Sequence, residues 1–147
     1  MSRTAANQRT TKETEIDIAL DLDGSGQTDI DTGLPFFSHM LDQLGRHGGF
    51  NLKVHATGDL EIDAHHTVED TAIVLGAALT EALGDKAGIE RYGESRVPMD
   101  ETLASVVLDF SGRPFTVFRA SFKNPKLGDF DTELAEEFFQ GLSRSAR

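Results

Sequence analysis

Two adjacent histidines and a glutamate offer the ligand chemistry of a metal centre. His65, His66 and Glu69 lie at the start of a long amphipathic segment. On an α-helix Glu69 follows His65 by four residues and His66 by three, so its carboxylate can share a face with either imidazole. The two imidazoles point about 100° apart, given about 3.6 residues per turn, so each one suits a different ion. Imidazole combined with carboxylate suits zinc, manganese, iron or nickel.

The same residues have a plainer interpretation as the solvated start of a helix. Asp63 would then cap the first turn, and Glu69 would favour the positive end of the helix dipole. A single His-x-x-x-Glu pair would favour that interpretation over a metal site. The second histidine, together with the groups described next, favours the metal site.

A second set of polar groups lies on the helix predicted for residues 34–47. His39 and His47 bracket this helix, and Asp42 and Gln43 lie on a face near His39. His39 therefore has a possible role as a ligand or as an acid–base group. Alone, a helical histidine is more often a packed or capped side chain.

Two arginines are placed for an anion. Arg91 follows a glycine-containing turn, and Arg113 lies in the turn formed by residues 111–114. In an acidic chain, loop arginines beside glycine indicate a local phosphate site. A surface ion pair with one of the chain's 25 carboxylates is an equally good explanation.

Hydropathy periodicity predicts the elements that position these groups. Alternation over residues 13–22 indicates a strand, followed by a glycine-rich hairpin turn and a short returning strand. Later elements are a helix at 34–47, a strand at 50–56, an extended segment at 60–63 and a helix at 65–83. Strands at 103–110 and 115–122 and a helix at 131–147 then repeat the order strand, strand, helix. This order indicates an internal duplication.

Composition excludes several classes of function. The chain has 147 residues, which indicates one domain, and it has no cysteine, which excludes disulfides and thiolate chemistry. The net charge of −11 argues against nucleic-acid binding, and no stretch is apolar enough to span a membrane. Residues 1–10 are polar and predict a flexible N-terminus without a secretory signal, which indicates a cytoplasmic protein.

Five segments together resemble a known family. They occur in order at residues 9–14, 32–41, 58–70, 98–101 and 111–114, and they include the Asp63-x-His65-His66-Thr67-Val68-Glu69-Asp70 motif. From about residue 9 to residue 147 the chain closely resembles imidazoleglycerol-phosphate dehydratases of histidine biosynthesis.

The resemblance implies a fold and an assembly. The expected class is α+β, with duplicated ribosomal-S5-domain-2-like halves, each a four-stranded sheet backed by two helices. Residues 11–147 would form the dehydratase domain, with a first repeat at about 11–97 and a partial second repeat at about 98–147. The chain ends before the family's second double-histidine motif. The family forms homo-24-mers with manganese sites between subunits.

The resemblance also implies roles for individual residues. The implied Mn²⁺ ligands are His39, His65, His66, Glu69 and Glu137, the last at a position where the family normally has a histidine. The implied catalytic groups are Glu13, His39 and Glu69. The implied substrate contacts are Glu13, His39, Asp42, Gln43, His47, His65, His66, Glu69, Arg91 and Arg113.

Two functions from different classes stay open on the sequence. One is the manganese-dependent dehydration of imidazole-glycerol phosphate to imidazole-acetol phosphate in L-histidine biosynthesis. The other is a non-catalytic, metal-binding assembly module, and a protein that truly ends at Arg147 is expected to show negligible turnover. A metallohydrolase is disfavoured, because no peptidase histidine spacing occurs.

Overall fold

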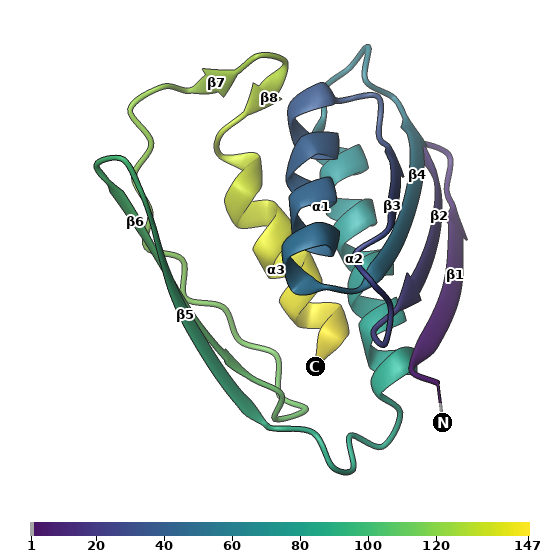
Figure 1. Ribbon diagram of the computed structural model, residues 1–147. Coiled ribbons are helices and arrows are strands. Elements are labelled where there is room, and N and C mark those ends of the chain that lie inside the picture. The colour runs from purple at the N-terminus through teal and green to yellow at the C-terminus, as the bar shows by residue number, and fades with distance from the viewer. Residues whose placement is uncertain (1) are drawn as a thin grey trace.

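The computed structural model describes residues 2–147, and over this range three helices lie between a four-stranded sheet and a long hairpin (Figure 1). The strands are β1 (Thr4–Thr10), β2 (Thr14–Asp21), β3 (Thr28–Asp31), β4 (Asn51–Gly58), β5 (Tyr92–Met99), β6 (Thr102–Asp109), β7 (Lys126–Leu127) and β8 (Phe130–Asp131). The helices are α1 (Pro35–Gly48), α2 (His65–Leu83) and α3 (Leu134–Ala146). The α+β class predicted from the sequence is confirmed.

The first sheet has the strand order β1-β2-β4-β3. β2 pairs antiparallel with both β1 and β4, whereas β3 pairs parallel with β4. The predicted hairpin between β2 and β3 is therefore wrong, because β4 lies between them. The sequence predicted a short strand at residues 27–31 after the glycine-rich turn, but hydropathy carries no information about which strand it pairs with.

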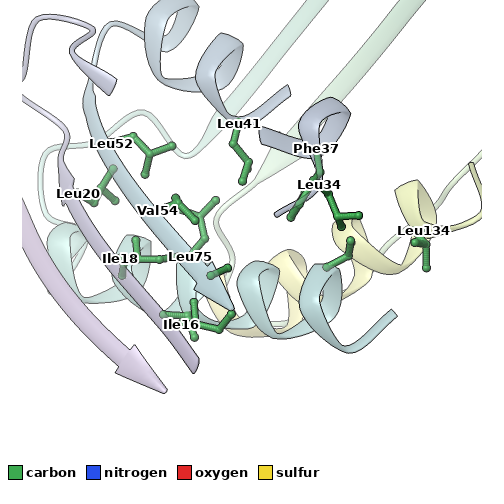
Figure 2. Packing of buried hydrophobic residues seen from close by; sticks show 14 of the residues in the cluster. Ile16, Ile18, Leu20, Leu34, Phe37, Leu41, Leu52, Val54, Leu75 and Leu134 are labelled. Carbon is green, nitrogen blue, oxygen red and sulfur yellow. The ribbon is translucent and has the colours of Figure 1, made fainter. Parts of the chain in front are cut away.

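One face of this sheet makes the hydrophobic core with α1 and α2. Ile16, Ile18 and Leu20 of β2 and Leu52 and Val54 of β4 are almost fully buried. Their spacing of two places them on the same face, and Figure 2 shows them gathered with Leu41 of α1 and Leu75 of α2. This core fixes the end of the sheet at which β3 and β4 finish and the chain continues into α1 and α2.

The N-terminal strand corrects the prediction of a flexible segment at residues 1–10. Met1 lies outside the described residues, but Thr4–Thr10 pairs along its whole length with β2. Arg9 and Asn7 also reach α2, where they bond to Asp70 and Glu81. Ala5 is the one buried residue of β1, so this edge strand gives little hydropathy signal. Backbone pairing, which hydropathy does not report, orders it.

The second half of the chain departs furthest from prediction. β5 and β6 form an antiparallel hairpin in which every residue is exposed, including Val97, Met99 and Val107. Residues 115–122, predicted as a strand, have no regular secondary structure. β5 also spans residues 97 and 98, between which the sequence predicted the repeat boundary.

α3 packs closely along α2. A Cβ atom on Gly76 would come within 2.6 Å of the Ser145 Cβ and 2.7 Å of the Leu142 carbonyl oxygen. Thr80 lies one turn further along α2 and donates to the Ser145 carbonyl at 2.8 Å. The two helices therefore run side by side in the same direction, and the missing side chain of Gly76 permits their close approach.

We expect Gly76→Ala to lower the free energy of unfolding by about 2 kcal/mol. The added methyl group must push the two helices apart, which costs about 3 kcal/mol, the upper end of overpacking costs. Alanine offsets about 1 kcal/mol of this through its higher helix propensity. Denaturant unfolding measures the difference. Gly93→Ala is the matched control, because a Cβ there meets no atom within 4 Å. Equal stability of the two variants would contradict the close packing of α2 on α3.

None of the helices within residues 2–147 is both long enough and apolar enough to cross a lipid bilayer.

Candidate metal centre

A glutamate from α3 joins the motif on α2. Side-chain ligand atoms of His65, Glu69 and Glu137 all lie within 4.8 Å of one another. Within α2, the His65 Nε2 lies 3.6 Å from a Glu69 carboxylate oxygen, as the spacing of four residues predicts. All three side chains are half-buried. One imidazole and two carboxylates form a donor set that suits a divalent transition metal such as manganese.

The second histidine of the motif points elsewhere. The rings of His65 and His66 are 5.8 Å apart between centroids and inclined at 75°. The His66 Nδ1 lies 3.0 Å from the Asp59 Oδ2, and this contact raises the pKa of His66 above its usual range. The charges of Glu13 and Asp63 raise the pKa of His66 further, which indicates that both carboxylates lie near this imidazole. The prediction that the two imidazoles diverge is confirmed.

The backbone register explains why Glu13 and Asp59 meet at this end of the sheet. Thr14 at the start of β2 pairs with Gly58 at the end of β4, so the residues just outside these strands are neighbours. The Thr11 hydroxyl accepts from the backbone N–H groups of Glu13 and Thr14 and closes the turn before β2. Strand pairing thus brings a carboxylate 53 residues away in sequence close to His66.

A buried aspartate ties that turn to the metal helix. Asp70 follows Glu69 on α2 and accepts from the Arg9 Nε at 3.0 Å and from the Thr14 hydroxyl. Its side chain is 11% exposed, whereas that of Arg9 is 44% exposed. A buried carboxylate is stable only when its hydrogen bonds are made. Asp70 therefore holds β1, the turn carrying Glu13 and the start of α2 together.

We expect Asp70→Asn to lower the free energy of unfolding by about 2 kcal/mol, because hydrogen bonds to a charged group are typically worth about 1.5–3 kcal/mol. Thermal and denaturant unfolding measure it. Asp17→Asn is the matched control, since Asp17 also pairs with a cation, Lys53, but on the exposed side of the sheet. That pair is expected to contribute under about 1 kcal/mol. Similar losses of unfolding free energy in the two variants would show that Asp70 contributes no more than an exposed ion pair does.

The predicted residues of α1 form a chain of contacts along that helix. Gln43 bonds to His47 at 3.0 Å, and Asp42 accepts from Arg46 at 2.9 Å and from the Thr28 hydroxyl. The Thr28 and Arg46 bonds hold the pKa of Asp42 below its usual range. His39 is exposed on the second turn of α1 and stands outside the cluster of ligand atoms found in residues 2–147. The structure therefore does not join His39 to His65 and Glu69 within the chain.

Asp109, at the base of the β5–β6 hairpin, pairs with Arg91 and also senses the charge of Arg113. Arg91 makes a two-point ion pair with Asp109, at 2.6 and 3.2 Å, and its guanidinium lies 4.9 Å from the Tyr92 ring centroid. Arg91 and then Arg113 lower the pKa of Asp109. For Arg91 the ion-pair interpretation of the sequence is therefore correct within this chain.

These arginines lie far from the metal-ligand cluster. Arg91 follows the C-terminal end of α2, and the Ser143 hydroxyl near the end of α3 donates to the Phe115 carbonyl, two residues beyond Arg113. His65 begins α2, which at 1.5 Å per residue is about 28 Å long. Figure 1 shows β5 starting at the end of the molecule where α2 and α3 finish.

The chain is similar to known proteins over nearly its whole length. The model of the imidazoleglycerol-phosphate dehydratase family matches residues 32–147. The chain belongs to this family. A relative of that name from Limosilactobacillus fermentum is 60% identical over 144 residues, covering 98% of this chain and 74% of that protein. Another from Geobacter sulfurreducens is 60% identical over 142 residues, covering 97% and 73%.

A solved structure shows the same fold. The crystal structure of imidazoleglycerol-phosphate dehydratase from Staphylococcus aureus matches with a TM-score of 0.86 and 43% identity, covering 97% of this chain and 78% of that one. The resemblance deduced from the sequence motifs is therefore confirmed, and the chain is a member of a family of hydro-lyases.

The sequence patterns gave no role to two residues that the structure places beside the candidate site. Asp59 and Asp70 both lie in the motif segment at residues 58–70, but neither was predicted to have a role. A signal for Asp70 was present, because it stands between the buried positions Val68 and Ala72 of α2. A carboxylate there must have partners. Asp59 gave no such signal, since its contact with His66 depends on the loop that follows β4.

Proposed function

We propose that the protein dehydrates imidazole-glycerol phosphate to imidazole-acetol phosphate in L-histidine biosynthesis, with Mn²⁺ as cofactor. Membership of the dehydratase family supports the reaction. The observation that carries the metal requirement is the convergence of His65, Glu69 and Glu137 from two helices.

Several residues would hold metal. His65, Glu69 and Glu137 form one ligand set, and His66, which points away from them, belongs to another, with His39 as a further candidate. When bound, manganese supplies Lewis acidity that stabilises negative charge on the imidazole ring of the substrate. Two metal ions, each held by one of these diverging imidazoles, would suit a substrate whose ring carries two nitrogens.

The remaining groups would move protons and bind phosphate. Glu13 faces His66 from the turn before β2, where a carboxylate can take the carbon-bound proton that must leave with the hydroxyl group. Arg91 and Arg113 offer charge-assisted hydrogen bonds to the phosphate. The phosphate would then replace Asp109 as the partner of Arg91. Phosphate binding away from the reacting carbons positions the substrate for the reaction.

The separation of these groups supports a homo-oligomer. The metal-ligand cluster and the arginines lie at opposite ends of the α2–α3 pair, and a substrate with three carbons between ring and phosphate cannot bridge that distance. A site using both must therefore combine residues from different copies of the chain. The family's 24-mer is the proposed assembly, and sedimentation velocity measures it.

Turnover decides the function. Purified protein of confirmed intact mass is incubated with imidazole-glycerol phosphate and Mn²⁺, and the ketone product is measured. Activity that is lost with a chelator and restored by Mn²⁺ is the expected result. Metal binding without turnover would instead support the non-catalytic assembly module.

A further inference from the structure

Asp59 makes its observed side-chain contact with a single group, the His66 imidazole. The Asp59 Oδ2 lies 3.0 Å from the His66 Nδ1. The carboxylate is 12% exposed, and its second oxygen, Oδ1, is buried with no hydrogen-bond partner among residues 2–147. A buried carboxylate with one partnered oxygen depends strongly on that contact. The pair is therefore a specific structural feature, unlike an exposed surface pair.

The contact determines which ring nitrogen carries the proton. An ionised carboxylate accepts hydrogen bonds and donates none, so the Nδ1 of His66 must be the donor. In the neutral imidazole the Nε2 is then unprotonated and carries the lone pair. The His66 side chain is 45% exposed, so the ring is not enclosed by its own chain.

His65 makes a different contact. Its Nε2, rather than its Nδ1, approaches a carboxylate, that of Glu69 on the same helix. The two neighbouring histidines thus have different carboxylate neighbours: Glu69 on α2 for His65, and Asp59 in the loop after β4 for His66. The backbone holds that loop, since Asp59 follows the Gly58–Thr14 pair and its carbonyl accepts from the Ile62 N–H at 2.8 Å.

We propose that Asp59 is a positioning residue that holds neutral His66 as the Nδ1–H tautomer and so presents Nε2 as a metal ligand. Its relevance to metal binding rests on the proposed function, whereas the tautomer itself is a property of this chain alone. Carboxylate partners of metal-binding histidines orient the ring and raise its basicity, and their loss typically reduces metal affinity by roughly 10–100-fold.

The tautomer is measured directly by ¹⁵N NMR of the histidine rings in metal-free protein above the His66 pKa. His66→Gln identifies the signals by their disappearance. We expect wild-type His66 to show a protonated Nδ1 and an unprotonated Nε2. In Asp59→Asn the amide can donate to Nδ1 as well as accept from it, so the Nε2–H tautomer becomes populated.

Asp63→Asn is the matched control. It removes the same charge from the same loop, but Asp63 bonds to the backbone N–H of His65 and not to a ring. We expect this variant to keep the wild-type tautomer. Mn²⁺ affinity, followed by electron paramagnetic resonance, should fall roughly 10–100-fold in Asp59→Asn and less than about threefold in Asp63→Asn.

The outcomes separate the two proposals. A wild-type His66 protonated on Nε2 overturns the inference without any variant. An Asp59→Asn variant in which His66 keeps the Nδ1–H tautomer of wild type also overturns it. Equal Mn²⁺ affinity of wild type and Asp59→Asn also overturns it. Absence of Mn²⁺ binding by wild-type protein in which His66 keeps the Nδ1–H tautomer supports the positioning role of Asp59 and counts against the proposed function.

Discussion

Replacing both His65 and His66 by alanine should reduce Mn²⁺ affinity more than about 100-fold, the largest effect expected from any substitution at the site. Loss of a residue that merely orients a ligand typically costs roughly 10–100-fold, so loss of two ligands must exceed it. Elemental analysis after equilibration with Mn²⁺ and titration by electron paramagnetic resonance measure the change. Unchanged metal content in the double variant would refute the assignment.

The matched control for that variant is Gln43→Ala with His47→Ala. This pair also removes a histidine and its bonded neighbour from one helix, but it lies along α1 and away from Glu69. Its metal content should equal that of wild type. Glu137→Gln extends the test to α3 and should weaken Mn²⁺ binding while leaving the contact of His66 with Asp59 intact, because Glu137 lies on the His65 side of the motif.

The sequence predicted best where periodicity and local spacing determine structure. The helix at 65–83 was predicted to the residue, because apolar positions repeat at helical spacing and Gly84 follows the last turn. The approach of His65 to Glu69 follows from the same geometry. A short strand was also predicted at residues 27–31, where β3 forms at Thr28–Asp31, but its predicted neighbour was wrong, since strand pairing joins residues that hydropathy cannot relate.

The long-range part of the site was beyond reach of the sequence pattern. The meeting of Asp59 with His66 depends on the β2–β4 register, and the approach of Glu137 to His65 depends on the packing of α3 against Gly76. Glu137 entered the prediction through family resemblance alone. Hydropathy also failed at Thr4–Thr10, because an edge strand held by backbone bonds and by Arg9 has no buried stripe to reveal it.

Replacing Phe37 by alanine should cost about 3–5 kcal/mol of unfolding free energy, the typical cost for a buried phenylalanine. Phe37 lies on α1 and is 3% exposed. Its ring is 6.0 Å from that of Phe130 and 5.6 Å from that of Phe138, between centroids. It thus packs the first helix against β8 and α3, which are nearly 100 residues away in sequence. At about 2–4 °C per kcal/mol, the melting temperature should fall by roughly 10 °C.

Phe139→Ala is the matched control, because Phe139 is the neighbour of Phe138 on α3 but is 44% exposed. It should cost less than half as much as Phe37→Ala. Glu137 precedes Phe138, so loosening α3 should also move its carboxylate away from His65 and weaken Mn²⁺ binding in Phe37→Ala more than in Phe139→Ala. Equal losses of stability and affinity in the two variants would show that Phe37 does not fix α3. The position of Glu137 would then depend on the α2–α3 contact at Gly76 alone.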